Sequence, residues 1–176
     1  MDKKSLGELL LQVSLLRGDF TLRSGRKSSF YFDKYRFETR PDLLRPVAEH
    51  LAAMLPKDVD RVAGAELGGL PLATAVALLT GLPFVIVRKA AKGYGTENRL
   101  EGEMRAGEHV VLVEDVATTA GAALSAVEAL REAGAGKVSA LVVLDRQEGA
   151  EQAFRDAGVP YQALFTAESL GIKEKP

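Results

Sequence analysis

Apolar residues recur at two spacings that predict helices and strands in alternation. A spacing of three to four residues indicates helices, and short unbroken apolar runs indicate buried strands. The pattern predicts helices over residues 5–17, 41–55, 70–79, 122–133 and 150–157 and strands over 61–63, 84–87, 110–113, 138–144 and 161–165. Such alternation is typical of an α/β fold, a parallel sheet with helices on both faces. The length predicts a single domain over residues 1–176.

The segment before the first predicted strand of the sheet has a different pattern. The first helix opens with a capping-box pattern at Ser5 and Glu8 and ends at Arg17-Gly18. Residues 20–33 predict a β-hairpin with its turn at 24–27. The hairpin carries basic residues beside aromatic ones: Arg23, Arg26, Lys27, Phe30, Tyr31 and Phe32. Basic groups beside flat rings suit a planar anion, although composition alone favours an ordinary hairpin with a solvated turn.

The stretch over 110–122, V-V-L-V-E-D-V-A-T-T-A-G-A, carries the clearest chemistry. A run of apolar residues predicts a strand buried on both faces, and Glu114 and Asp115 follow it directly. A loop with Thr118 and Thr119 then enters a helix, whose N-terminal N–H groups and positive dipole end suit a phosphate. Carboxylates favour sugar hydroxyls or a metal ion. The stretch therefore predicts a site for a phosphorylated ribose.

Other interpretations of this stretch are weaker. It lacks the P-loop pattern G-x-x-x-x-G-K-[ST] and the dinucleotide pattern G-x-G-x-x-G. It also looks like the acidic strand end of a response-regulator receiver domain, where the acidic pair follows the first strand. Here at least two strand patterns precede the pair. A buried strand with a merely solvated acidic end remains possible, but this is less common when T-T-A-G follows two carboxylates.

Unusual side chains follow several predicted strands of the sheet. They are the glycine loop 64–69, Arg88-Lys89, Glu114-Asp115 and Asp145-Arg146. Because the carboxyl ends of parallel strands meet at one edge, we expect these clusters to share one crevice. The segment over 89–103 is long for a connection and combines glycines with Lys89, Lys92 and Arg99, which is typical of a lid or of a solvated loop.

Composition excludes several classes of function. The net charge of −1 provides no basic field for nucleic acid. The absence of cysteine excludes disulfides and thiolate metal sites and fits a cytoplasmic location. Residues 70–87 carry no charge and nearly reach membrane-spanning length. Pro71, Gly81 and Pro83 indicate a buried helix, a turn and a strand instead, so we expect no membrane segment.

Four motifs occur between Phe20 and Glu148: F-T-L-x-S-G-R-K-S, R-K-x-x-K-x-Y-G, E-D-V-x-T-T and L-D-R-Q-E. Together they resemble orotate phosphoribosyltransferases, which are type I phosphoribosyltransferases. The third motif is common to type I enzymes, while the first and last select orotate. The resemblance implies a five-stranded parallel sheet flanked by helices, with a small N-terminal hood built by about residues 1–40.

The resemblance also implies an activity. The family transfers ribose 5-phosphate from phosphoribosyl diphosphate to orotate, giving orotidine 5-phosphate and diphosphate in pyrimidine (UMP) biosynthesis. Mg²⁺ is implied as the cofactor, held mainly through substrate and without direct protein ligands. A homodimer is implied, with lid residues acting in the partner's site. A purine phosphoribosyltransferase and a non-catalytic regulator of the same fold are the alternatives.

Roles follow for the matching residues. The implied catalytic residues are Lys92, Glu114 and Asp115. Phosphoribosyl diphosphate binding is implied for Arg88, Lys89, Lys92, Tyr94, Glu114, Asp115, Val116, Ala117, Thr118, Thr119, Ala120, Gly121 and Ala122, with loop 64–69 at the diphosphate. Orotate binding is implied for Arg23, Tyr31, Phe32, Thr118 and Arg146. In this scheme the acidic pair meets the ribose hydroxyls and Arg146 pairs with the orotate carboxylate.

Three positions depart from the best-known bacterial pattern. Tyr94 stands where many members have a lid histidine, so imidazole chemistry there is not essential in this protein. Gly68 replaces a lysine of the diphosphate loop, so one phosphate contact is lost or supplied from elsewhere. Arg23 replaces a lysine of the hood. These departures bear on affinity rather than on the reaction.

Overall fold

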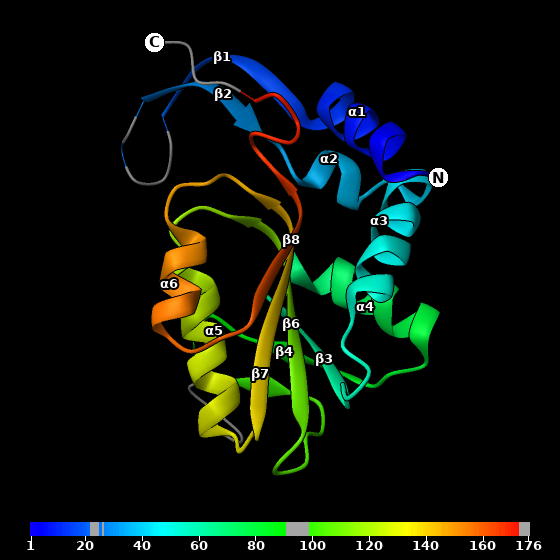
Figure 1. Cartoon of the computed structure of the whole chain (residues 1–176), viewed down its shortest axis with the longest axis vertical. Coiled ribbons are helices and arrows are strands. Elements are labelled where there is room, and N and C mark those ends of the chain that lie inside the picture. Colours follow the sequence, from blue (N-terminus) through cyan, green and yellow to red (C-terminus); the bar gives the residue numbers. More distant parts are fainter. Residues whose placement is uncertain (22–24, 26, 91–98, 173–176) are drawn as a thin grey trace.

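The computed structural model describes residues 1–21, 25, 27–90 and 99–172. Within these ranges six strands form a central sheet in the order β5-β4-β3-β6-β7-β8 (Figure 1). The strands are β3 (Arg61–Ala65), β4 (Phe84–Val87), β5 (Leu100–Glu101), β6 (His109–Ala117), β7 (Lys137–Asp145) and β8 (Tyr161–Thr166). The five strands that the sequence predicted pair in parallel, which confirms the expected fold.

The short strand β5 was not predicted from the sequence. It pairs antiparallel with β4 at the edge of the sheet, through Ile86 opposite Glu101 and Val87 opposite Leu100. Two residues are too few to produce a periodic pattern, and they fall inside the segment 89–103, for which we expected a lid or a solvated loop. The last part of that segment therefore belongs to the sheet.

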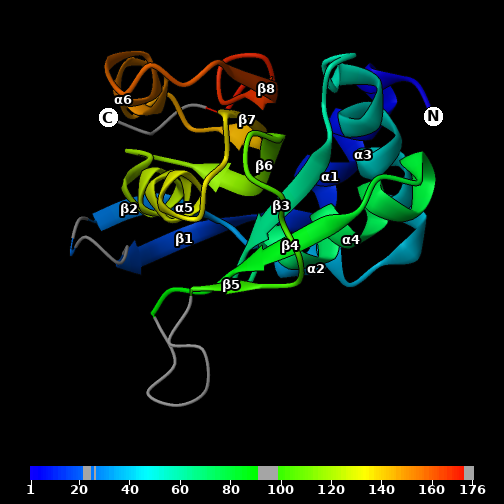
Figure 2. The same ribbon diagram turned by 90° about the horizontal axis from the view of Figure 1, so that it is seen from below.

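Helices cover both faces of the sheet. Helices α3 (Pro41–Met54) and α4 (Gly69–Thr80) lie on one face, and α5 (Gly121–Glu132) and α6 (Ala150–Asp156) lie on the other (Figures 1 and 2). Alternate side chains of β6 serve the two layers: Val111 and Val113 pack in the first layer, while Val110 and Leu112 pack in the second. The central strand is buried on both faces, as its unbroken apolar run predicted.

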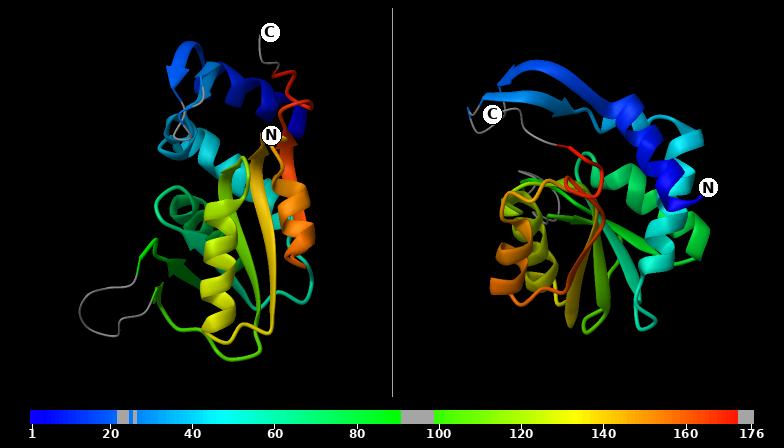
Figure 3. Two further views of the ribbon diagram at one scale, coloured as in Figure 1. Left: turned by 90° about the vertical axis from the view of Figure 1, so that its left-hand side faces the viewer. Right: turned by 45° about the horizontal axis from the view of Figure 1, so that its top comes forward.

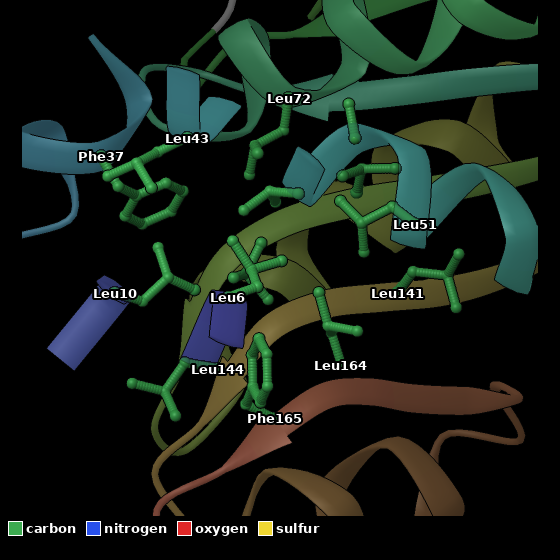
Figure 4. Close-up of a cluster of buried hydrophobic side chains, with 14 of the residues drawn as sticks. Leu6, Leu10, Phe37, Leu43, Leu51, Leu72, Leu141, Leu144, Leu164 and Phe165 are labelled. Atoms are coloured by element: carbon green, nitrogen blue, oxygen red, sulfur yellow. The ribbon is translucent and has the colours of Figure 1, made fainter. Parts of the chain in front are cut away.

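The leucine-rich first layer also holds the N-terminal helix α1 (Lys3–Ser14). Figure 4 shows Leu6 and Leu10 of α1 gathered with Leu43 and Leu51 of α3 and with Phe165 of β8. Leu6, Leu10 and Leu51 are fully buried. This packing fixes the N-terminal segment to the main sheet.

A hairpin follows α1 and lies over the carboxyl ends of the parallel strands (Figures 1 and 3). It consists of β1 (Leu15–Thr21) and β2 (Lys27–Phe32) and leads into the short helix α2 (Tyr35–Glu38). Helix α2 was not predicted, because a single turn carries no helical periodicity. The hairpin and α2 place a roof of aromatic and charged side chains above the edge where the site was expected.

The predicted limits of the first helix were wrong at both ends. Asp2 caps the helix, since its carboxylate accepts hydrogen bonds from the Ser5 N–H at 2.9 Å and the Ser5 hydroxyl at 2.7 Å. The helix ends at Ser14 rather than at Arg17, because Leu15 to Arg17 pair with β2. Strand pairing here overrides the helical spacing of Leu16.

Residues 70–87 form α4, a turn and β4, as Pro71, Gly81 and Pro83 predicted. Gly81 ends α4 in the left-handed conformation, with a φ of 76°. In the part of the chain that the structure describes, no helix has both the length and the apolar character needed to cross a membrane.

Candidate active site

The acidic pair lies at the carboxyl end of β6, in the middle of the sheet. The strand continues through both carboxylates to Ala117, with Glu114 opposite Val142 and Ala117 opposite Asp145 of β7. This is longer than the 110–113 predicted. Asp115 is only 3% exposed, and its Oδ1 accepts a hydrogen bond from the Val116 N–H at 2.5 Å. Burial and this hydrogen bond therefore hold the carboxylate in one orientation.

A cavity of about 380 Å³ opens beside the acidic pair. We call it the basic cavity. Its charged lining residues are Lys34, Glu66, Arg88, Lys89, Arg99, Glu114 and Asp115. The clusters that follow β3, β4 and β6 therefore converge, as the topology predicted. Cations from the end of β4 face carboxylates from the end of β6 across this space, which suits a ligand with an anionic part and hydroxyl groups.

The loop over 64–69 folds tightly against the end of β6. A Cβ atom on Gly64 would lie 2.5 Å from the Gly69 carbonyl oxygen, and one on Gly69 would lie 2.6 Å from the Val113 carbonyl oxygen. Only glycine allows such an approach of two backbone segments. The Glu66 carboxylate accepts a hydrogen bond from the Lys89 N–H at 2.6 Å, which joins the loop to the end of β4. The peptide bond between Glu66 and Leu67 is cis.

A second, smaller cavity of about 130 Å³ lies beside Glu114. We call it the loop cavity, because residues 116–123 line it together with Glu114, Phe154 and Tyr161. Ala120 adopts a left-handed φ of 61° at the start of α5, and no side chain caps this helix. The first N–H groups of α5 are therefore available to an anion. Glu114 lines both cavities, so the two adjoin at this residue.

Arg146 lies beneath the hairpin, directly after β7. Its backbone N–H donates to the Ala117 carbonyl at 2.9 Å, and its guanidinium carbon lies 4.7 Å from the centre of the Phe30 ring. The side chain is 7% exposed, and Nε approaches Glu148 Oε1 at 2.9 Å. Nη2 is buried and has no hydrogen-bond partner among the described residues. A buried guanidinium nitrogen in this state suits a carboxylate ligand.

The aromatic residues of β2 are divided between its faces. Phe32 is buried against Phe37 of α2, with ring centres 6.3 Å apart, whereas Tyr31 is 40% exposed and lies beside Phe20. Neighbouring strand residues point to opposite faces, so these two rings cannot cover the same face of one base. Phe30, which the sequence did not single out for binding, is the ring that Arg146 contacts. The orotate roles of Tyr31 and Phe32 stay predictions.

Comparison with known proteins decides which family uses this geometry. The phosphoribosyl transferase domain model matches residues 43–157. The orotate phosphoribosyltransferase of Methanocella arvoryzae is 46% identical over 170 residues, which cover 96% of this chain and 97% of that protein. The protein of the same name from Halobacterium salinarum is 49% identical over 153 residues and covers 87% of each chain. This chain belongs to the orotate phosphoribosyltransferase family.

Solved structures of the orotate phosphoribosyltransferase family agree with this assignment. The Mycobacterium tuberculosis enzyme in complex with Fe(III) dicitrate has a TM-score of 0.85 and 33% identity and covers 97% of this chain and 99% of its own. The Aeropyrum pernix enzyme has a TM-score of 0.83 and 36% identity, with coverage of 94% and 95%. The resemblance drawn from the four motifs and the expected type I fold are therefore confirmed.

Some of the other residues to which the family resemblance assigned roles lie at the two cavities, and others lie outside the described residues. Arg88 is half-buried and its Nη1 lies 3.4 Å from Glu101 Oε1, while Lys89 is exposed at the rim of the basic cavity. Thr118 and Thr119 line the loop cavity. Arg23, Lys92 and Tyr94 lie outside the described residues, so their predicted roles rest on the resemblance alone.

The sequence analysis missed two charged residues: Lys34, which directly precedes α2, and Glu38, which lies in α2. Lys34 Nζ lies 2.5 Å from Asp115 Oδ2, and Glu38 is buried next to this pair. Burial lowers the pKa of Lys34, but the charge of Asp115 and its hydrogen bond outweigh burial and raise that pKa above its ordinary value. No motif marks either residue. The only available signal was a lysine and a glutamate four residues apart, which usually form a solvated helix face.

Glu38 is a buried carboxyl group in the roof that lies close to the charge of Asp115. Neither carboxyl oxygen has a hydrogen-bond partner among the described residues. Burial, and next the nearby charge of Asp115, raise the pKa of Glu38 from 4.5 to about 8. Burial and Asp115 also raise the pKa of Glu114. Glu38 and Glu114 therefore hold their protons to a higher pH than exposed carboxyl groups do.

Glu38→Gln is expected to change how stability depends on pH. Because the folded-state pKa of about 8 exceeds the ordinary 4.5, the folded protein holds a proton that the unfolded chain loses. The stability that Glu38 contributes is complete below about pH 4.5 and is lost as pH rises towards 8. The loss has a slope of up to about 1.4 kcal/mol per pH unit. The amide side chain of the variant cannot titrate, so Glu38→Gln should lose this slope and be the more stable protein above pH 8.

Urea unfolding of the ligand-free protein at several pH values measures this difference. Glu132→Gln, at an exposed position of α5, is the matched control and should keep the wild-type profile. If Glu38→Gln follows the wild-type profile as well, Glu38 is ionised throughout and its assigned environment is wrong.

Proposed function

We propose that this chain transfers ribose 5-phosphate from phosphoribosyl diphosphate to N1 of orotate and releases diphosphate. The observation that carries the proposal is that Glu114 lines both the loop cavity and the basic cavity. A ribose at Glu114 and Asp115 would extend its 5-phosphate to the N-terminus of α5 and its diphosphate to Arg88 and Lys89. Relatives that cover most of this chain carry the name of this activity.

The chemistry needs charge placement rather than a side-chain nucleophile. When the bond between ribose C1 and the diphosphate oxygen breaks, positive charge develops on the ribose and negative charge on the leaving group. In this scheme buried Asp115 and half-buried Glu114 would lie on the side of the ribose, and the cations that follow β4 would lie on the side of the diphosphate. Orotate N1 bonds to C1, the electron pair of the broken C1–oxygen bond leaves with diphosphate, and the N1 proton passes to water. Throughout this step Arg146 holds orotate through the carboxylate of the base.

Mg²⁺ belongs to the proposal as a cofactor bound mainly by substrate. Among the described residues, no group of three acidic or histidine side chains could hold a metal ion. Glu114 and Asp115 at the basic cavity would bind the ribose hydroxyls, which leaves phosphate oxygens, ribose hydroxyls and water as the oxygen ligands that Mg²⁺ prefers. This donor set fits an ion that arrives with phosphoribosyl diphosphate, where it would neutralise charge on the leaving group. The predicted cytoplasmic location also stays part of the proposal.

The proposed activity is tested by following the loss of orotate absorbance with phosphoribosyl diphosphate and Mg²⁺. Adenine, hypoxanthine and xanthine are assayed in parallel. The Arg146 guanidinium and its unpartnered Nη2 favour a base with a carboxylate, so orotate should be consumed and the purines should not. Consumption of a purine in preference to orotate would establish the alternative enzyme, and no reaction with any base would favour the regulator.

We further propose a homodimer in which Lys92 acts in the partner's site, as the family resemblance implies. The test mixes two inactive variants, Lys92→Ala and Asp115→Ala, by unfolding and refolding them together. If Lys92 acts in trans, a mixed dimer has one site with both lesions and one with neither. Random pairing makes about half of the dimers mixed, so roughly a quarter of all sites should be intact.

Activity near a quarter of the wild-type value would therefore support the crossed arrangement. Each variant refolded alone is the control and should stay inactive. Gel filtration of differently tagged chains must show that subunits exchanged. No recovery despite proven exchange would assign Lys92 to its own subunit's site.

A further inference from the structure

Lys34 lies between β2 and α2, outside every motif that identified the family. Its ammonium nitrogen is 2.5 Å from Asp115 Oδ2, and its side chain lines the basic cavity. The side chain of Lys34 is 28% exposed, whereas that of Asp115 is 5% exposed. The ion pair thus joins a buried carboxylate to a cation that is open to the cavity.

Gly68 shows how closely this pair fits against the loop over 64–69. A Cβ atom on Gly68 would lie 1.6 Å from Asp115 Oδ2 and 2.8 Å from Lys34 Nζ. The ion pair therefore occupies the volume that any side chain at position 68 would need. The ammonium group is in direct reach of a ligand that lies along this loop, although Lys34 comes from a distant part of the sequence.

Among the described cations of the basic cavity, Arg88 and Arg99 have protein partners for their side chains, whereas Lys89 is exposed at the rim. Arg88 Nη1 is 3.4 Å from Glu101, and Arg99 donates to the carbonyl groups of Arg88 and Ser125 at 3.2 Å. A lysine ammonium has three N–H donors, and Lys34 uses one of them on Asp115. Its remaining donors can bind an anion without breaking the ion pair.

We propose that Lys34 binds a diphosphate oxygen of phosphoribosyl diphosphate while it keeps its hydrogen bond to Asp115. This inference rests on the proposed function and adds a binding residue to it. As the ribose C1–oxygen bond breaks, its electron pair passes to the diphosphate oxygen, and the Lys34 ammonium stabilises that charge. One side chain then couples the carboxylate near the ribose to the leaving group.

Lys34→Met tests the assignment, since it keeps an unbranched side chain and removes the charge. Titration calorimetry measures the binding of Mg²⁺-diphosphate and, separately, of ribose 5-phosphate to the folded protein. The Kd for diphosphate should rise about tenfold or more, as expected when a charged hydrogen bond is lost. The Kd for ribose 5-phosphate should stay within about threefold. Lys34→Arg should restore most of the diphosphate affinity.

Lys137→Met is the matched control, because Lys137 forms an ion pair with Asp58 at the opposite end of β7. It should change neither affinity. If Lys34→Met weakens both ligands equally, or weakens neither, Lys34 only supports Asp115 and the inference is wrong. If Lys34→Met does not fold, Lys34→Gln and Lys34→Arg decide by the same comparison of the two ligands. A wild-type protein that binds diphosphate but converts no orotate would contradict the proposed function instead.

Discussion

Arg146→Ala is expected to raise the KM for orotate strongly while the affinity for phosphoribosyl diphosphate stays near normal. The guanidinium lies under the hairpin against Phe30, and its buried Nη2 has no partner in the described part of the chain. Without Arg146, the orotate carboxylate would be buried without its charged partner. Such a loss costs about 2–5 kcal/mol. Steady-state kinetics with each substrate varied in turn measure the effect.

Arg155→Ala is a matched control for this variant. Arg155 is exposed on α6, in an ion pair with Glu151 on the same helix, so both KM values should stay unchanged. Equal loss of affinity for both substrates in Arg146→Ala would count against the assignment. The Arg146 side chain would then support the site through its contacts with Glu148 and Phe30 rather than bind the base.

Asp115→Asn is expected to lower kcat more than it weakens substrate binding. The substitution keeps the shape of the side chain and removes the charge, and positive charge on the ribose develops only in the transition state. Removing one such electrostatic contact typically lowers kcat by roughly a hundredfold or more. Single-turnover rates together with equilibrium binding of phosphoribosyl diphosphate separate the two effects.

The variant also leaves Lys34 without its carboxylate partner, so thermal unfolding must be measured alongside the kinetics. Asp156→Asn on the exposed face of α6 is the matched control and should leave both unchanged. If Asp115→Asn loses thermal stability but keeps its kcat, the acidic pair serves the fold and not the reaction.

The parallel sheet could be predicted because its strands consist of unbroken runs of apolar residues. The run from Val110 to Val113 is buried on both faces, and this burial requires apolar residues at every position. The extent of β6 could not be predicted, since Glu114, Val116 and Ala117 continue the strand by pairing with β7. The end of α1 was missed for a related reason. Leu15 and Leu16 fit a helical spacing, but their pairing with β2 is a long-range contact that local sequence does not report.

The candidate site could be predicted where charged side chains come directly after a predicted strand in the sequence. The topology alone brings Glu66, Arg88 and Asp115 to one cavity. Lys34 and Glu38 could not be found in this way, because α2 is held against α1 and α3 and its place does not follow from the sheet order. The sequence also assigned orotate binding to Tyr31 and Phe32 but not to Phe30. Which ring of β2 faces Arg146 depends on the register of the hairpin.

The most direct test of the proposed transfer is to identify both products of one reaction. The chain is incubated with orotate, phosphoribosyl diphosphate and Mg²⁺, and orotidine 5-phosphate and diphosphate are quantified by chromatography. A site that holds ribose between the loop cavity and the basic cavity, with orotate on Arg146, predicts that both products appear in equal amounts. Release of diphosphate without orotidine 5-phosphate, or formation of neither product by folded protein, would contradict it.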